Sequence, residues 1–154
     1  MHSKLRKQIR KILIPNTRID ESRNDLYWKN IRYWKNPSDY WFAWEIDDIF
    51  VNYLNVPVAD IRDFLNYGES SNKFFANAAE PYYSYSYSDL KRIEFDLIHC
   101  LIGLDKRIGR DRLFTPIIRY GEDYAFLKLF KDRIAHECPS SYNRDTQYIV
   151  YLSD

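Results

Sequence analysis

Apolar residues recur at intervals of three and four along most of this chain of 154 residues. That spacing places side chains on one face of an α-helix, so the pattern predicts a mainly helical fold. The first such segment has Leu5, Ile9, Ile12 and Leu13 between lysines and arginines. It predicts a short amphipathic helix that ends at Pro15, because a proline ring clashes with the preceding helical turn.

Residues 20–35 continue this spacing. Tyr27, Ile31 and Trp34 are separated by four and three residues. We therefore expect a second helix here. The pair Asn36-Pro37 would end it, because the residue before a proline avoids helical backbone angles.

Two more helices are predicted in the segment that follows. Over 40–54, one apolar stripe is formed by Phe42, Ile46, Ile49 and Tyr53. Over 57–68, Pro57 suits a first turn and Gly68 suits a helix end. The apolar positions of that helix are Val58, Ile61 and Leu65.

The second half of the chain carries the longest regular pattern. A helix is expected over 88–107, followed by Gly109, with apolar positions at Leu90, Ile93, Leu97, Leu101, Leu104 and Ile108. A last helix is expected over 122–137, with acids early and cations late, as the helix dipole favours. Between them, 113–119 is apolar and β-branched around Pro116, which predicts an edge strand or a turn.

Strand-like segments are few. Residues 82–87 alternate Tyr and Ser, so the tyrosines at 83, 85 and 87 would share one face of a strand. Residues 147–152 have strand composition and are a natural mate. The expected fold is mainly α with a small β element (α+β). It would be a compact helical single domain over 1–154, with a two-stranded antiparallel ribbon of about 82–87 with 147–152.

Charge is unevenly distributed although the net charge is only +1. Residues 1–18 hold six Lys or Arg and no acid, whereas residues 37–80 hold eight acids against Arg62 and Lys73. Such separation steers charged partners rather than building a fold. The composition, 45% hydrophobic and 29% charged, is that of a soluble globular protein. No apolar run reaches the roughly 18 residues that a membrane helix needs, so we expect no membrane partner.

Catalytic signatures are sparse. The chain has no Gly-rich phosphate loop, no G-x-S-x-G and no H-E-x-x-H. Arg92 and His99 have the spacing Arg-x6-His, which resembles the signature of HEPN domains, helical folds many of which are ribonucleases. The resemblance implies that Arg92 and His99 would form an acid/base and phosphate-contacting pair. Ile93 departs from the family, which usually has a polar residue after the arginine.

The two cysteines, Cys100 and Cys138, suit a reducing cytoplasm, where a buried free thiol behaves as a small hydrophobic group. Together with His99 and His136 they could supply four zinc ligands. Adjacent His-Cys pairs lack the usual spacing of two to four residues, so we expect neither a metal nor a cofactor.

The acidic segment 37–80 also contains the aromatic residues Tyr40, Trp41, Trp44, Tyr53 and Tyr67. Acids combined with aromatic residues are typical of protein interfaces. Rings supply affinity there, and charges of one sign supply steering and specificity. The residues expected to contact a partner are Glu45, Asp48, Asp60, Asp63, Glu69, Trp41 and Trp44.

In its small size, its lack of catalytic motifs and its acidic segment, the chain resembles bacterial toxin-immunity proteins, such as those of contact-dependent growth inhibition systems. The resemblance implies a cytoplasmic, non-enzymatic protein that blocks the active site of a basic nuclease toxin. The alternatives are the ribonuclease above and a nucleic-acid-binding regulatory module that uses the basic N-terminal helix. A pI near 7.7 argues against nucleic acid as the main partner.

Overall fold

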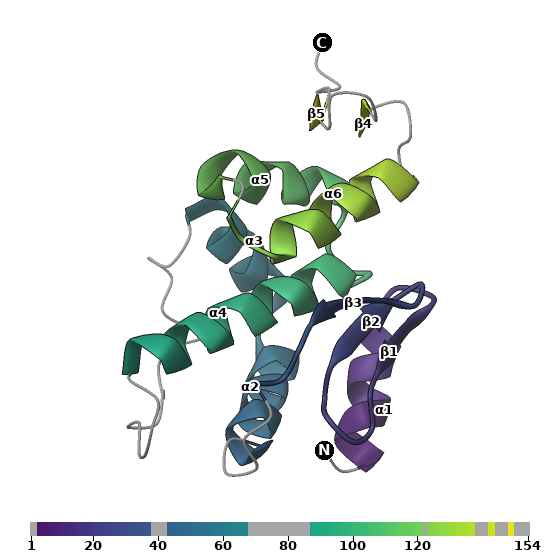
Figure 1. Ribbon diagram of the computed structural model, residues 1–154, viewed down its shortest axis with the longest axis vertical. Helices are drawn as coiled ribbons and strands as arrows, with labels where there is room; N and C mark the ends of the chain where they lie inside the picture. Colours follow the sequence, from purple (N-terminus) through teal and green to yellow (C-terminus); the bar gives the residue numbers. More distant parts are fainter. Residues whose placement is uncertain are drawn as a thin grey trace.

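The computed structural model describes residues 3–37, 43–67, 87–121, 123–137, 142–143 and 148–149. In these ranges the fold is mostly helical, as the apolar spacing predicts (Figure 1). The α-helices are α1 Ser3–Ile12, α2 Ala43–Asn55, α3 Val58–Tyr67, α4 Tyr87–Leu104, α5 Phe114–Tyr120 and α6 Phe126–Glu137. A short 3-10 helix, η4 (Arg110–Leu113), precedes α5.

Five of these helices confirm predicted segments. Most of their predicted apolar positions are buried, whereas Ile12, Val58 and Ile93 are half-buried. In α1, for example, Leu5 and Ile9 are buried and the cations lie between them. Helix α4 ends at Leu104 rather than Arg107, because Asp105 pairs with Leu13 as an isolated antiparallel bridge. Helix α6 begins at Phe126, four residues later than predicted.

The predicted helix over 20–35 is wrong. This part of the chain forms a three-stranded antiparallel sheet of β1 Thr17–Ile19, β2 Leu26–Trp28 and β3 Ile31–Trp34, in that order. Lys29 and Asn30 have φ of 51° and 66°, so both lie in the left-handed region that a tight hairpin turn requires.

A β-bulge explains why a strand looked helical in the sequence. Tyr27 pairs with Arg32, but Leu26 pairs with Trp34, so Tyr33 is an extra residue in β3. Tyr33 and Trp34 are consequently both buried, at 8% and 7% exposure. The bulge breaks the alternation of the strand, so the period of two that marks a strand is missing from its sequence.

The predicted strand or turn over 113–119 is also wrong, because this segment is the end of η4 and helix α5. Pro116 is the third residue of α5, within the first turn, where a missing N–H breaks no intrahelical hydrogen bond.

Within the described residues, the segment 147–152 of the predicted ribbon pairs with a different strand. Strand β5, Tyr148–Ile149, pairs antiparallel with β4, Tyr142–Asn143. The strand prediction for 147–152 is therefore confirmed for two residues, with a different mate. Tyr87 belongs to α4, and residues 82–86 lie outside the described part of the chain.

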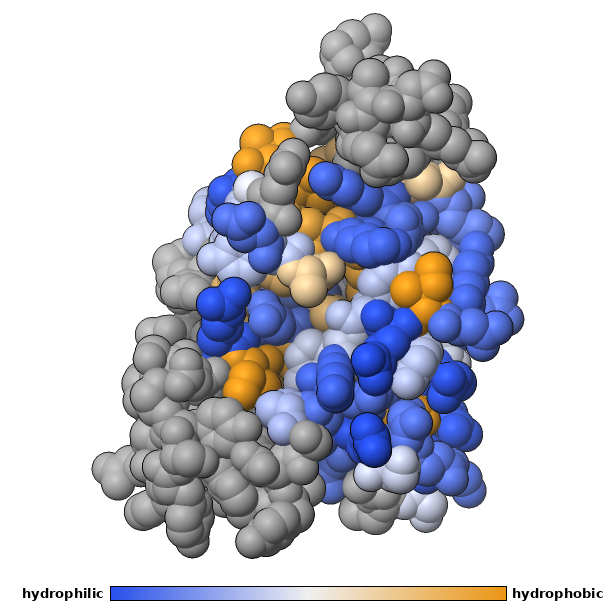
Figure 2. Space-filling model, viewed as in Figure 1, coloured by the Kyte–Doolittle hydropathy of each residue, from blue (hydrophilic) through white to orange (hydrophobic). Residues whose placement is uncertain are grey.

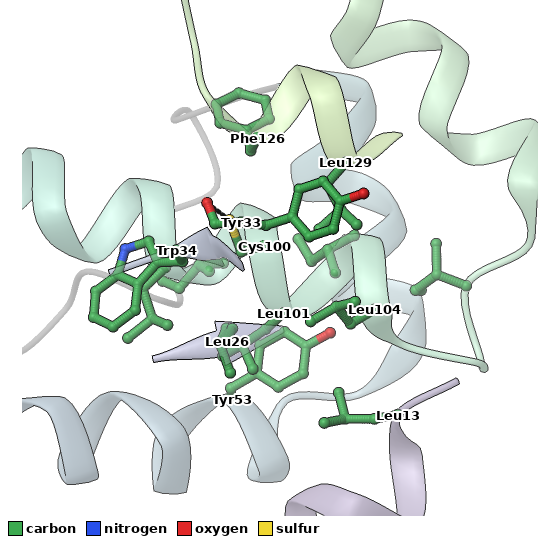
Figure 3. Packing of buried hydrophobic residues seen from close by; sticks show 14 of the residues in the cluster. Leu13, Leu26, Tyr33, Trp34, Tyr53, Cys100, Leu101, Leu104, Phe126 and Leu129 are labelled. Carbon is green, nitrogen blue, oxygen red and sulfur yellow. Dashed lines mark hydrogen bonds between the residues drawn. The ribbon is translucent and has the colours of Figure 1, made fainter. Parts of the chain in front are cut away.

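Helix α4 lies at the centre of the core, where side chains from α2, α6 and the sheet converge on it (Figure 3). Its Leu97, Leu101 and Leu104 have no exposed surface. Gly103 allows the close approach of α6, since a Cβ there would lie 2.8 Å from Leu129 Cδ2. The core therefore joins the N-terminal sheet to the C-terminal helices as one hydrophobic cluster.

Arg133 of α6 stabilises the turn that follows α4 through hydrogen bonds. Its side chain is 2% exposed and donates to the carbonyls of Gly103 at 3.2 Å, Asp105 at 3.0 Å and Ile108. Its Nε donates to Glu137 at 3.1 Å, which pairs the buried charge.

The carboxylate of Asp105 is the second buried charge of this turn. It accepts from the Tyr53 hydroxyl at 2.7 Å and from the Arg107 guanidinium at 2.7 Å. The turn thus holds α2, α4 and α6 in register.

Candidate functional site

The sequence places the predicted partner-binding residues on α2 and α3 and in the segments beside them. Asp48 on α2 and Asp63 on α3 are exposed, and Asp60 on α3 is half-buried. Trp44 and Glu45 belong to α2, although their side chains are not described. Trp41 and Glu69 lie outside the described part of the chain. Within 43–67 five acids stand against Arg62, a net charge of −4.

Helix α3 presents an acidic and aromatic row to solvent. Asp60, Asp63 and Tyr67 are spaced by three and four residues, so they lie along one face of the helix. The opposite face is buried, with Ile61 and Phe64 at 0% exposure. Tyr67, at the end of this row, is 70% exposed.

Helix α5 contacts the end of α3 through Arg119. Its guanidinium donates to the Leu65 carbonyl at 3.1 Å and to the Asn66 carbonyl. These are carbonyls of the last turn of α3, which lack partners within a helix and carry negative partial charge. The contact brings α5 against the end of α3, where Tyr67 lies.

Ile118, the neighbour of Arg119, is 65% exposed. Figure 2 shows apolar residues reaching the surface over α5. We refer to Asp60, Asp63, Tyr67 and Ile118 as the α3–α5 surface. It combines two carboxylates with an aromatic and an aliphatic side chain, the mixture that interface cores and rims use.

Helix α2 adds a smaller outward face. Asp48 and Val51 lie three residues apart, and Val51 is 42% exposed. The inward side is buried by Ile46, Phe50 and Tyr53, all at 0% exposure. Consecutive acidic helices therefore each pair an exposed carboxylate with an exposed apolar side chain.

The residues that resemble the HEPN pair are not both at the surface. Arg92 is exposed, whereas His99 is fully buried. The His99 ring stacks on Phe126, with ring centroids 4.1 Å apart, and lies 4.9 Å from the ring of Phe64. Its Nδ1 donates to the Phe95 carbonyl at 2.8 Å.

The surroundings of His99 keep its imidazole neutral. Burial lowers the pKa of His99 to about 3, because the charged ring would lose its hydration. Among the described residues, its Nε2 has no hydrogen-bond partner. This geometry gives His99 a packing role, and its side chain has no exposed surface.

No group of three or more His, Cys, Asp or Glu is placed to hold a metal within the described residues. Cys100 is fully buried, and burial raises the pKa of its thiol, so the thiolate is disfavoured. Cys138 lies outside the described residues.

Sequence reasoning missed Ile118 as a surface residue because it assigned 113–119 to a strand or a turn. The doublet Ile117-Ile118 carried a signal. On a surface helix, neighbours point about 100° apart, so one of two adjacent isoleucines faces away from the core. Ile117 packs against the core and Ile118 does not.

Comparison of the chain with known protein families, with curated proteins and with solved structures finds no match. Among the helices of the described residues, none combines the length and the apolar character that a membrane span requires.

Proposed function

We propose that this protein is a small, non-enzymatic binding protein that captures a basic partner protein through the α3–α5 surface. The observation that carries the proposal is the exposure of Tyr67, at 70%, beside Asp60 and Asp63 on one helix face. Ile118 supplies a second apolar anchor at 65% exposure.

Rings and carboxylates contribute to different steps of binding at a protein interface. Exposed rings gain most when a partner covers them, and alanine substitution of such a hot spot typically costs about 2 kcal/mol or more. Carboxylates around the ring attract a positive partner over a Debye length of about 8 Å and speed its capture. On α2, the exposed Asp48 adds another carboxylate and the exposed Val51 adds a small apolar side chain.

The partner class that fits is a basic nuclease toxin, with this chain as its cytoplasmic immunity protein. A surface of carboxylates and rings competes with the phosphates and bases that such an active site binds. Neutralisation would then be steric and electrostatic, with no chemistry on either chain. A ribonuclease acting through Arg92 and His99 would require α4 and α6 to separate, so the α3–α5 surface has more support.

The test is co-expression with the basic protein encoded by the neighbouring gene, followed by calorimetry on the purified pair. Replacing Asp60 and Asp63 together by lysine is expected to weaken binding at least a hundredfold, and Tyr67→Ala at least tenfold. Asp123→Lys, an exposed acid outside this surface, is the matched control. Unchanged affinity in both the double variant and Tyr67→Ala would disprove this interface.

A further inference from the structure

The sheet carries a row of planar and positive side chains on its outer face. Arg18 of β1 pairs with Tyr27 of β2, and Tyr27 pairs with Arg32 of β3. Neighbouring residues of β1 and β2 are buried, as with Ile19 and Leu26, so these three side chains face the other way. We refer to Arg18, Tyr27 and Arg32 as the sheet row.

The sheet row is held in place by contacts of its own. The Arg18 guanidinium lies over the Tyr27 ring, 3.8 Å from its centroid. Arg32 Nη1 lies 3.6 Å from the Asp25 carboxylate, which is buried beneath the strands, while 45% of the Arg32 side chain stays exposed. A guanidinium and a ring are thus fixed at the surface before any partner arrives.

The surroundings of the sheet row are strongly positive. Residues 3–37 contain ten Lys or Arg and three acids, a net charge of +7. Each of the three acids already has a hydrogen-bond or ion-pair partner within this region. Asp25 accepts from the Asn36 N–H at 2.7 Å, Glu21 pairs with Arg6 at 3.2 Å, and Asp20 accepts from Ser22.

Hydrophilic side chains cover the side of the molecule where α1 and the sheet lie (Figure 2). On α1, which packs against β1, the side chains of Lys4, Lys7 and Lys11 are exposed at spacings of three and four. They add positive potential at the edge of the sheet. The apolar face of α1 is already used, since Leu5 and Ile9 are buried, so this helix has no face left for insertion into a membrane surface.

From these contacts we infer that the sheet row is a binding site for single-stranded nucleic acid. Lysines and arginines contact phosphates without regard to sequence, and bases stack on aromatic rings and on guanidinium planes. An acidic protein would use the same charge, whereas the stacked pair of Arg18 and Tyr27 also matches the flat faces of nucleic-acid bases. The site is separate from the α3–α5 surface and does not depend on the function proposed for it.

The test is fluorescence anisotropy with labelled single-stranded DNA and RNA of mixed sequence, titrated between about 50 and 200 mM KCl. Binding is expected to weaken steeply with salt. Arg18→Gln and Tyr27→Leu should each raise the Kd about fivefold or more, whereas Tyr27→Phe, which keeps the ring, should leave it within about twofold. Circular dichroism confirms that each variant is folded.

The matched control is Arg112→Gln, which removes one exposed positive charge from η4. It should change the Kd less than about twofold, and so should Asp60→Lys with Asp63→Lys. Equal losses in Arg112→Gln and Arg18→Gln would mean binding by net charge alone and would overturn the site. Binding of polyglutamate without binding of either oligonucleotide would overturn it in favour of an acidic protein.

Discussion

The basic region 3–37 and the acidic region 43–67 use charge in opposite ways. In the basic region, carboxylates form ion pairs with nearby arginines, as Asp25 does with Arg32 and Glu21 with Arg6. In the acidic region, the carboxylates of Asp48 and Asp63 point to solvent. The first region has a net charge of +7 and the second −4, which the total of +1 conceals. A near-neutral protein can therefore carry two surfaces for two kinds of partner.

The largest expected effect tests whether the two regions fold together. Arg133→Met removes three hydrogen bonds and leaves three carbonyls of the turn after α4 without this donor, so the free energy of unfolding should fall by about 3–5 kcal/mol. Urea unfolding should be followed by circular dichroism and by tryptophan fluorescence. Coincident transitions at the lower midpoint are expected.

The control for Arg133 is the exposed Arg112. Arg112→Met should change the free energy of unfolding by no more than about 0.5 kcal/mol. Two separate transitions in the wild-type protein would show that the basic and acidic regions are independent units, contrary to their shared core.

The second effect concerns pH and His99, which packs between α3 and α6. The pKa of His99 is about 3 in the folded protein and about 6.5 in the unfolded chain. Between these two pH values, the imidazole is protonated in the unfolded chain and neutral in the folded protein. Stability is therefore lost as pH falls from about 6.5 towards 3, by up to about 1.4 kcal/mol per unit. At pH 5 we expect a loss of about 2 kcal/mol, measured by urea unfolding at a series of pH values.

His99→Phe separates this effect from general acid destabilisation. The variant keeps a ring in the aromatic cluster and removes the titrating group, so its stability should fall less between pH 6.5 and 5 than that of the wild type. Parallel pH profiles for the two proteins would contradict the assignment to His99.

A smaller effect compares two carboxylates of the basic region. Asp25→Ala removes the acceptor of the Asn36 N–H and the charge beneath Arg32, and should cost about 1–3 kcal/mol of unfolding free energy. Glu21→Ala removes an exposed pair with Arg6 and should cost less than about 1 kcal/mol. Thermal unfolding of the two variants ranks them, and equal midpoints would refute the buried role of Asp25.

The smallest effect belongs to the acidic region. Replacing Asp60 and Asp63 by lysine should change the free energy of unfolding by about 1 kcal/mol in total, because Asp63 is exposed and Asp60 is half-buried in the first turn of α3. The same variant is expected to lose the partner. A large loss of stability, measured by chemical denaturation, would show that these carboxylates support the fold rather than a surface.

The helical part of this fold could be predicted because its apolar spacing is local. Helices α2, α3 and α4 each bury residues that recur every three or four positions. The sheet could not be predicted from spacing because the bulge at Tyr33 makes two consecutive residues of β3 face inward. The left-handed turn at Lys29 and Asn30 was a weaker signal than an Asn-Gly pair.

The residues of the candidate sites also differ in whether local sequence or a long-range contact sets their position. The surface positions of Asp48 and Asp63 could be predicted because acids on the outer face of a predicted helix stay near the surface. Ile118 was missed because its position depends on the contact of Arg119 with the end of α3, which joins residues far apart in the sequence. The sheet row depends on the register of three strands, which the sequence did not reveal.

The bridge between Leu13 and Asp105 also constrains the order of folding. The Ile14 N–H donates to the Leu104 carbonyl and the Lys106 N–H to the Ile12 carbonyl, so α1 is fixed by a segment about ninety residues later. Closing so long a loop costs entropy that only late contacts repay. During synthesis, the end of α1 therefore gains these two hydrogen bonds only after the end of α4 has left the ribosome.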